Sequence, residues 1–542
     1  MTAQASIRPY LNQAYLLGLL MVAVGLTLSP FLMGMSQFWL LLVWLVDVFA
    51  SYPPFKGVPE GRGIKQKLTR FWHNKAAVLL VAFYLMHVVG LLWTSDFDYA
   101  WKDLRVKLPI LVMPFALSSM EPLDRKRFDF VMLVYVLSVF VATVFSSVTY
   151  WRHDYEDVRE ISHFISHIRF CLNVVFSMGV IGYYLTLKSV WWSKAIQVVL
   201  LLWFTYQIFI FESLSGYVIL AAVVIVSAVY AFLQWKKSRG WHIAIGAAAL
   251  AVLVVGIVAV VHFVRPMLKV EPVDLSTLEK KTALGNDYWH DTVYNPIEDG
   301  KYVGLYYCRK EMQEAWSERS ALPFEGTTTN GENLEATLAR YLTSKDLRKD
   351  AQGVMALTDE DIRNVEQGVA NYNNWKHPGI HARLSATLFE YNLYRRFNNP
   401  NGGSLSQRIE FTRASFHIIG QYPWFGVGTG DVPQAFAQTY DEIHSPLKEE
   451  FRFRAHNQYL AIAVAFGLVG LAFFLFVLLY PWFATKWNHT YLYILYMVFL
   501  CVMLLSMFPE DTLETQAGAT LFAFFISLLL FARPQNSMDV NQ

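Results

Sequence analysis

Apolar stretches long enough to cross a bilayer recur along this 542-residue chain, on both sides of one long polar segment. A hydrocarbon core of about 30 Å is spanned by about 20 apolar residues in a helix. We therefore predict about twelve membrane helices, at residues 12–29, 31–50, 76–94, 106–119, 128–149, 168–187, 195–212, 215–234, 241–264, 457–484, 489–508 and 515–533. The predicted fold class is an all-α polytopic membrane protein.

Composition supports this fold class and excludes several others. Hydrophobic residues make up 55% of the chain and charged residues 16%, which excludes a purely water-soluble enzyme. The 45 Lys and Arg residues nearly balance the 43 Asp and Glu residues, so no positive excess points to nucleic acid as a partner. The 3 cysteines are too few and too scattered for a disulfide framework or a thiolate zinc site.

Charge asymmetry between the loops predicts the orientation. With a cytoplasmic N-terminus, the inner loops at 51–75, 120–127, 188–194, 235–240 and 485–488 are rich in Lys and Arg, as inner loops usually are. The outer loops are acidic instead. The polar segment 265–455 then lies outside, in what would be the periplasm of a two-membrane bacterium.

This orientation gives a complete domain layout. Helices 1 to 9 occupy residues 1–264, the periplasmic domain 265–455, helices 10 to 12 residues 456–533, and a cytoplasmic tail 534–542. Apolar residues recur at helical spacing in 333–344, 359–372, 379–396 and 404–420, so we predict a large, mainly helical periplasmic domain between helices 9 and 10. The first apolar run is interpreted as a retained helix.

The segment from Arg454 to Phe474, RAHNQYLAIAVAFGLVGLAFF, opens the tenth helix and carries the strongest site signal. In a regular helix Gly467 lies within about 20° of His456, on one small-residue seam. Such a seam lets another helix approach closely and holds the histidine above it. A helix N-terminus disfavours positive charge, so we expect a neutral imidazole that can take up a proton. The alternative is a histidine that, beside Asn457, anchors the helix at the lipid headgroups.

Three segments resemble the O-antigen ligase superfamily of membrane glycosyltransferases. His456 and Asn457 are followed after nine residues by Gly467 and after two more by Gly470, which resembles the histidine motif of the family. Residues 408–430, RIEFTRASFHIIGQYPWFGVGTG, resemble its arginine-led helix and Pro-x-x-Gly-x-Gly turn. Residues 166–170, SHIRF, resemble its arginine-bearing start of the sixth helix. Residues 270–400 match no family pattern, and residues 212–217 lack the arginine that many ligases carry there.

The resemblance implies that a glycan moves from undecaprenyl-pyrophosphate to an acceptor hydroxyl at the periplasmic face of the inner membrane. We expect no cofactor and no metal. The expected acceptor is lipid A-core, as in O-antigen ligases. The same superfamily includes O-antigen polymerases and protein O-oligosaccharyltransferases, which remain alternatives. A transporter of lipid-linked glycan is a further alternative, but the charges here cluster at helix ends and no internal repeat is evident.

The resemblance and the chemistry together assign roles to seven residues. Arg408 and Arg169 are expected to hold the pyrophosphate and stabilise its developing charge, since guanidinium groups bind such oxygens in pairs. His456 is expected to remove the acceptor proton, so that displacement inverts the anomeric carbon. The predicted substrate-binding residues are Arg413, Arg454, Asn457 and His167. For the interfacial arginines, contact with the phosphates of membrane lipids is the alternative.

Two other groupings resemble metal sites. Asp96 and Asp98 resemble the paired carboxylates of other polyprenyl-dependent transferases, but a solvated acidic loop is favoured. His163 and His167 have a suitable spacing for one helical face but no third ligand. We therefore predict no metal site.

Overall fold

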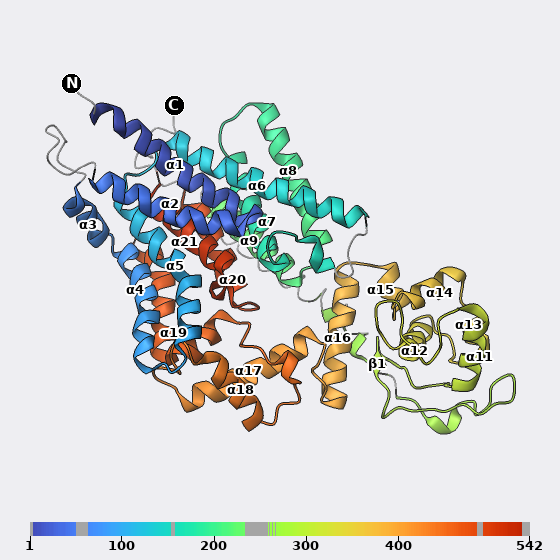
Figure 1. Ribbon diagram of the computed structural model, residues 1–542. Coiled ribbons are helices and arrows are strands. Elements are labelled where there is room, and N and C mark those ends of the chain that lie inside the picture. The colour runs from blue at the N-terminus through green and yellow to red at the C-terminus, as the bar shows by residue number, and fades with distance from the viewer. Residues whose placement is uncertain are drawn as a thin grey trace. The chain divides into compact units, whose positions relative to one another are not determined.

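The computed structural model describes residues 4–49, 63–152, 158–233, 272–484 and 492–533, with short stretches between 258 and 270. The described chain is mainly helical (Figure 1). Its only strands in these ranges are β1, Ile297–Glu298, and β2, Lys301–Tyr302, which pair antiparallel. The predicted helical fold class is confirmed at this level.

Helices occupy the predicted spans that fall within the described residues. They are α1 Gln4–Leu28, α2 Pro30–Phe49, α4 Lys75–Val89 with η1 Gly90–Trp93, α5 Phe97–Ser119, α6 Arg125–Arg152, α7 His167–Leu185, α8 Trp191–Ile210, α9 Leu214–Leu233, α19 Gln458–Ala484, α20 Tyr493–Ser506 and α21 Gln516–Leu530. Nearly all of the predicted span 241–264 lies outside the described residues. A short helix, α3 Ile64–His73, precedes α4.

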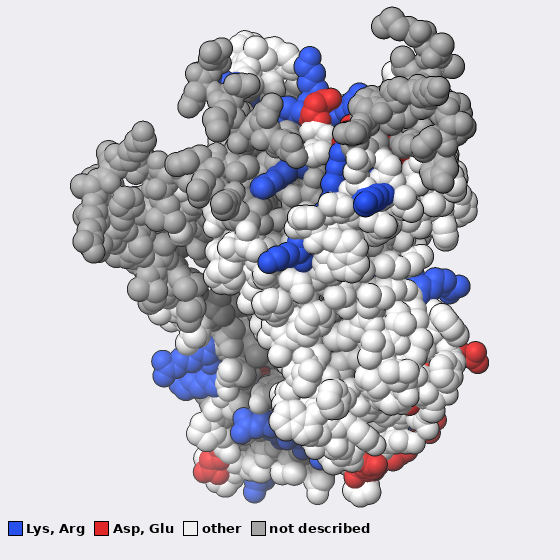
Figure 2. All heavy atoms as spheres, turned by 90° about the vertical axis from the view of Figure 1, so that its left-hand side faces the viewer, with Lys and Arg blue, Asp and Glu red and all other residues white. Residues whose placement is uncertain are grey.

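Among the described residues, 7 helices are long and apolar enough to cross a membrane: α1, α2, α4 with η1, α6, α7, α8 and α19. Several expose large apolar side chains, such as Phe31, Phe38 and Leu85. Figure 2 shows a broad face of uncharged residues, with charged side chains mostly toward the top and bottom of the view. Such a surface suits contact with acyl chains. The total of twelve spans and the periplasmic orientation remain predictions.

The chain divides into two compact units, which are described separately. The first comprises residues 1–238, 411–444 and 452–542, and the second residues 239–410 and 445–451. Residues 411–444 contain the end of α17, Ser404–Gln421, and all of α18, Val432–Glu442, and they belong with the apolar helices. The second unit therefore covers less of the chain than the predicted domain 265–455.

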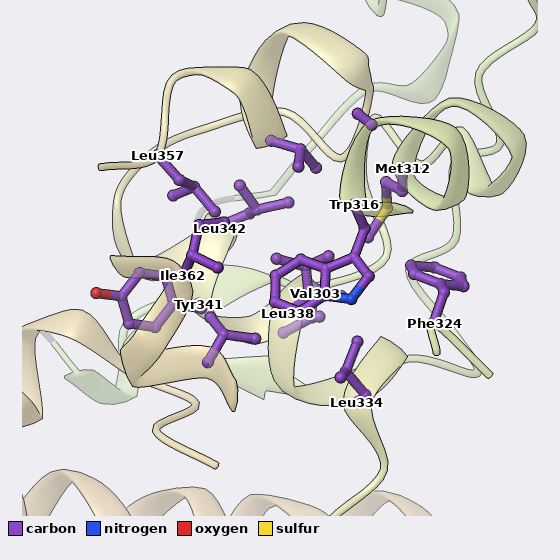
Figure 3. Close-up of a cluster of buried hydrophobic side chains, with 14 residues drawn as sticks. Val303, Met312, Trp316, Phe324, Leu334, Leu338, Tyr341, Leu342, Leu357 and Ile362 are labelled. Atoms are coloured by element: carbon purple, nitrogen blue, oxygen red, sulfur yellow. The ribbon is translucent and has the colours of Figure 1, made fainter. Parts of the chain in front are cut away.

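The second unit has its own hydrophobic core (Figure 3). Trp316, on α11 Arg309–Arg319, is fully buried and donates a hydrogen bond from Nε1 to the Leu322 carbonyl. Leu334, Leu338 and Leu342 recur every four residues on α12, Leu334–Ser344, so one face of this helix enters the core. The unit is a folded domain, as its sequence predicts.

The remaining helices of the second unit are α13 Ala351–Met355, α14 Asp359–Glu366, α15 Tyr372–Lys376 and α16 Ile380–Phe397. The helices predicted at 333–344, 379–396 and 404–420 are confirmed as α12, α16 and α17. Helix α14 is shorter than the predicted 359–372, because Gly368 follows it with a φ of +86° that a helix cannot continue through.

Candidate active site

His456 lies two residues before the first residue of α19, in a left-handed backbone conformation with φ +44°. The Asn457 side chain makes two hydrogen bonds at the start of the helix. Its Oδ1 accepts a hydrogen bond from the Leu460 backbone N at 3.0 Å, and its Nδ2 donates to the Phe508 carbonyl at 2.9 Å. The Asn457 amide thereby attaches the histidine to the loop that follows α20, and its predicted role toward substrate remains a prediction.

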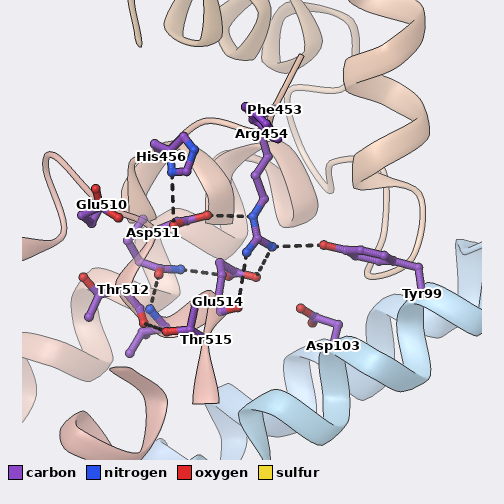
Figure 4. A network of polar contacts seen from close by, with 12 residues as sticks. Tyr99, Asp103, Phe453, Arg454, His456, Glu510, Asp511, Thr512, Glu514 and Thr515 are labelled. Atoms are coloured by element: carbon purple, nitrogen blue, oxygen red, sulfur yellow. Dashed lines mark hydrogen bonds and ion pairs between the residues drawn. The ribbon is translucent and has the colours of Figure 1, made fainter. Parts of the chain in front are cut away.

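That loop supplies an acidic partner for the histidine (Figure 4). Nδ1 of His456 lies 3.6 Å from Oδ1 of Asp511. The Asp511 side chain is 3% exposed, whereas that of His456 is 35% exposed. The imidazole also packs against Phe411 and Phe453, with ring centroids 5.5 and 6.2 Å away. One edge of the ring therefore faces a buried carboxylate, while part of it stays open to solvent.

Arg454 holds the other oxygen of this carboxylate. Its Nε lies 2.7 Å from Oδ2 of Asp511, and its Nη1 lies 3.2 Å from Oε2 of Glu514 and donates a hydrogen bond to the Tyr99 hydroxyl at 3.0 Å (Figure 4). Burial alone raises the pKa of Asp511, but contact with His456 and the charge of Arg454 outweigh it, so the pKa lies below its usual value. Asp511 is therefore an anion at neutral pH.

Glu514 links Arg454 to a buried lysine. Nζ of Lys107, on α5, lies 2.7 Å from Oε2 of Glu514 and also pairs with Asp103. Gln458 donates from Nε2 to Oε1 of Glu514 at 3.1 Å. Burial raises the pKa of Glu514, but Lys107 and Arg454 lower it further than burial raises it. These alternating charges hold Arg454, and through it Asp511, in one position.

Arg169 lies beside the neighbouring acid of the same loop. Its Nη2 is 3.9 Å from Oε2 of Glu510, the residue before Asp511, and its side chain is 15% exposed. Its Nε is buried without a hydrogen-bond partner among the described residues. Arg169 and His456 thus each face one of two consecutive carboxylates. His167 begins α7 two residues before Arg169.

Arg408 and Arg413 both lie on α17, but in different units. Arg408 lies in the part of the helix that belongs to the second unit. Arg413 is exposed in the first unit and donates a hydrogen bond from Nη2 to the Ile443 carbonyl, at the end of α18, at 3.2 Å. Their roles toward substrate remain predictions.

Helix α19 is interrupted at Gly467, where φ is +66° and ψ is −169°. The prediction that Gly467 lies below His456 on one regular helical face is therefore wrong. The turn at residues 423–428 pairs with the backbone exposed by the break. Leu468 N donates to the Pro423 carbonyl at 2.8 Å, and Gly428 N donates to the Ala465 carbonyl at 2.9 Å. At the break, the backbone of residues 423–428 contacts the backbone of α19 directly. A side chain at Gly467 would prevent this contact.

Glycine is required on both sides of this contact. A Cβ at Gly467 would lie 2.3 Å from the Trp424 carbonyl carbon, and a Cβ at Gly426 would lie 2.4 Å from that of Ala465. Both residues also have positive φ. The tight turn lies at residues 423–425, directly before the Gly426–Gly430 run, and these close contacts position the first half of α19, which begins two residues after His456.

The same turn is attached to the start of α5. The Asp431 carboxylate accepts hydrogen bonds from the backbone N of Ser95 and of Asp96, at 2.9 and 2.8 Å. Asp96 in turn accepts from Tyr99 N at 2.9 Å and caps α5. Asp96 therefore caps this helix, and the absence of a metal at Asp96 and Asp98 remains a prediction.

One cluster does have distances suited to a metal ion. Ligand atoms of His456, Glu510 and Asp511 all lie within 4.8 Å of one another. Each of the two carboxylates, however, already faces a guanidinium, Asp511 that of Arg454 and Glu510 that of Arg169. A divalent cation would meet two fixed positive charges here.

The acidic residues of this site were not predicted from the sequence. Glu510, Asp511 and Glu514 lie in residues 508–516, FPEDTLETQ, between the last two apolar helices. The available signal was three acidic residues without a cation in a short loop between two predicted membrane spans.

Comparison with known proteins finds one family model that matches part of the chain. Residues 378–475 match the family model described as O-antigen ligase. The matched range contains Arg408, Arg413, Arg454, His456 and the broken first half of α19. A search of curated proteins found no match. The match to this ligase domain and the motifs within it support membership of the O-antigen ligase superfamily, whose members are glycosyltransferase-like proteins, and the apolar helices suit a multi-pass membrane protein.

Proposed function

We propose that this protein is an inverting glycosyltransferase that moves a glycan from undecaprenyl-pyrophosphate to an acceptor hydroxyl at the periplasmic face of the inner membrane. The specific activity proposed is that of an O-antigen ligase, with lipid A-core as acceptor. Family membership supports a lipid-linked glycan donor in general. The observation that carries the proposal is the contact of His456 with the buried carboxylate of Asp511, which Arg454 holds in place.

His456 acts as the general base. The proposed tautomer carries its proton on Nδ1, the nitrogen that lies 3.6 Å from Oδ1 of Asp511, and its lone pair on Nε2. As the acceptor oxygen attacks the anomeric carbon, its O–H bond breaks and the proton passes to Nε2. The bond from the anomeric carbon to the phosphate oxygen breaks at the same time, and undecaprenyl-pyrophosphate leaves with the electron pair. The anionic Asp511 stabilises the imidazolium that forms.

Arginines compensate the charge of the leaving group. Nε of Arg169 is buried and has no hydrogen-bond partner in the described part of the chain, and the side chain lies beside the same acidic loop, which suits it to the pyrophosphate. Arg408 is proposed as the second pyrophosphate ligand, on family grounds. Arg454 is engaged by Asp511 and Glu514, so its contribution is to position the dyad. Arg413, Asn457 and His167 are proposed to contact substrate around this centre.

A reconstituted assay tests the proposal. Purified full-length protein in detergent receives undecaprenyl-pyrophosphate glycan and, in separate reactions, lipid A-core, a repeat-unit acceptor or a peptide. A glycan joined to lipid A-core supports the ligase, whereas products on the other acceptors would indicate a polymerase or a protein glycosyltransferase. Near-normal transfer by a folded His456→Ala variant would contradict the general-base role. Movement of the donor across a vesicle membrane without any product would indicate a transporter.

A further inference from the structure

The second unit contains an open cavity of about 370 Å³ whose lining includes none of the residues assigned to the candidate active site. This volume falls in the range of small-molecule binding sites. Its lining is mostly polar and includes one aromatic ring. The side chains that matter here are Asn330, Glu332, Arg340, Asn374 and Trp375.

One wall of the cavity is a loop that the rest of the unit holds in place. Thr327 pairs with Asn333 across the loop, and Thr329 N donates to the Glu366 carbonyl, at the end of α14, at 2.8 Å. Gly368 lies directly under the Asn330 amide, since a Cβ at that position would lie 2.2 Å from it. Because φ at Gly368 is +86°, the close approach depends on glycine.

A second wall comes from α12. Leu338 and Leu342 enter the core, and Arg340 lies on a different face of the helix and lines the cavity. Its Nε and Nη2 bind the two carboxylate oxygens of Glu298 at 2.8 and 2.9 Å, and its guanidinium lies 3.9 Å from the centre of the Phe389 ring. The arginine is thus held rigidly, and its charge is already balanced.

The third wall is α15. Asn371 Oδ1 accepts hydrogen bonds from the backbone N of Asn373 and Asn374, which fixes the first turn. Oδ1 of Asn374 is buried and has no hydrogen-bond partner among the described residues. Beside it, Trp375 is 40% exposed, the kind of exposed aromatic surface that binding sites use. A buried acceptor without a donor, next to an open indole ring, is the arrangement that a ligand would complete.

We infer that this cavity binds one or more sugar units of the glycan substrate. Sugar hydroxyls both donate and accept hydrogen bonds. They can therefore bond to the carboxylate, the two amides and the guanidinium that line the cavity. The C–H face of a pyranose ring packs against an indole. The carboxylate of Glu332, which has no ion-pair partner among the described residues, and the paired charge of Arg340 disfavour a phosphate or pyrophosphate. The polar lining offers no apolar pocket for peptide anchor residues. The ligand class rests on the proposed glycosyltransferase function.

The test uses the full-length protein in detergent, labelled with a fluorophore. The protein is applied to an array of lipid-free oligosaccharides, with synthetic peptides on the same array, and the strongest oligosaccharide is then titrated by calorimetry. Trp375→Ala and Asn374→Ala are each expected to weaken its binding about 10-fold or more, whereas Trp375→Phe keeps most of it. The matched control is Trp289→Ala, because Trp289 is an exposed tryptophan of the same unit that does not line the cavity.

Binding of peptides alone, or oligosaccharide binding that folded Trp375→Ala and Asn374→Ala variants both retain, would overturn the inference. Its failure can be told apart from failure of the proposed function. Wild-type protein that transfers glycan but binds no free oligosaccharide refutes the cavity and leaves the transferase standing. Oligosaccharide binding that the cavity variants weaken, in a protein that transfers nothing, supports the cavity and refutes the transferase. His456→Ala is expected to lose transfer and keep oligosaccharide binding.

Discussion

Nδ1 of His456 lies 3.6 Å from Oδ1 of Asp511, a carboxylate from the loop between α20 and α21. This relationship gives the motif histidine a buried anionic partner that the family resemblance did not include. It also explains why Arg454 lies two residues before the histidine, because its guanidinium holds the second carboxylate oxygen. The site is thus built by two segments that the intervening helices bring together.

Asp511→Asn tests this relationship directly. Loss of the anion removes the stabilisation of the imidazolium and weakens control of the ring orientation, so we expect glycan transfer to fall about 100- to 10,000-fold. The measurement is the initial rate of product formation by purified protein. Asp441→Asn is the matched control, because Asp441 is 74% exposed and pairs only at the surface with Arg452. A rate within about 2-fold of the wild type for Asp511→Asn would remove the dyad from the mechanism.

The buried carboxylates predict loss of stability in acid. The ordinary pKa values of Asp511 and Glu514 are 3.8 and 4.5, and both lie lower in the folded protein. Their contribution to stability is therefore complete above the ordinary values and is lost as the pH falls from those values to the lowered ones. Differential scanning fluorimetry of the detergent-solubilised protein should show Tm falling below about pH 4.5.

Glu514→Gln should lower Tm at neutral pH and make its decline in acid shallower, because the variant has one fewer buried group to protonate. Glu450→Gln, at a site that is 65% exposed, serves as the control and should leave the profile unchanged. Equal acid profiles for Glu514→Gln and wild-type protein would contradict the role assigned to the network.

Gly467→Ala tests the break in α19. The alanine would need a φ of +66° and would place its Cβ 2.3 Å from the Trp424 carbonyl carbon. We expect a loss of about 1–3 kcal/mol or more in stability, together with reduced transfer, because the start of α19 shifts with His456. Gly420→Ala is the control, since no atom lies within 4 Å of a Cβ there. The comparison is made by Tm and by transfer rate. An unchanged Tm for Gly467→Ala would show that the helix tolerates a regular conformation.

Arg169→Lys tests pyrophosphate binding. Lysine keeps the charge but cannot make paired hydrogen bonds to phosphate oxygens, so we expect kcat/KM for the donor to fall about 10-fold or more. Arg127→Lys is the control, because Arg127 is 40% exposed and pairs with Asp124. Unaltered donor kinetics for Arg169→Lys would assign the pyrophosphate to other groups.

A chelator tests the cluster of His456, Glu510 and Asp511. Because Arg454 and Arg169 already face its carboxylates, we expect transfer to continue at its full rate in excess EDTA. Abolished transfer that returns on addition of a divalent cation would instead identify the cluster as a metal site.

Sequence alone predicted the features that depend on local pattern. The membrane helices follow from runs of apolar residues, and α12 follows from leucines spaced by four residues. The histidine motif, the Pro423 turn and the family follow from short segments. Each of these signals lies within one helix or one turn, where neighbouring residues determine the conformation.

Only the tertiary structure determined which residues these helices and turns contact. Asp511 becomes the partner of His456, and the backbone at Pro423 fits the break at Gly467, only because helices distant in sequence pack together. The proposed position of Arg408 at the same centre remains a prediction. Helical periodicity reports which face of a helix is apolar, but it carries no information on which residue of another segment lies opposite. Buried charges are the clearest case, since each of them is stable only beside a partner that chain folding supplies.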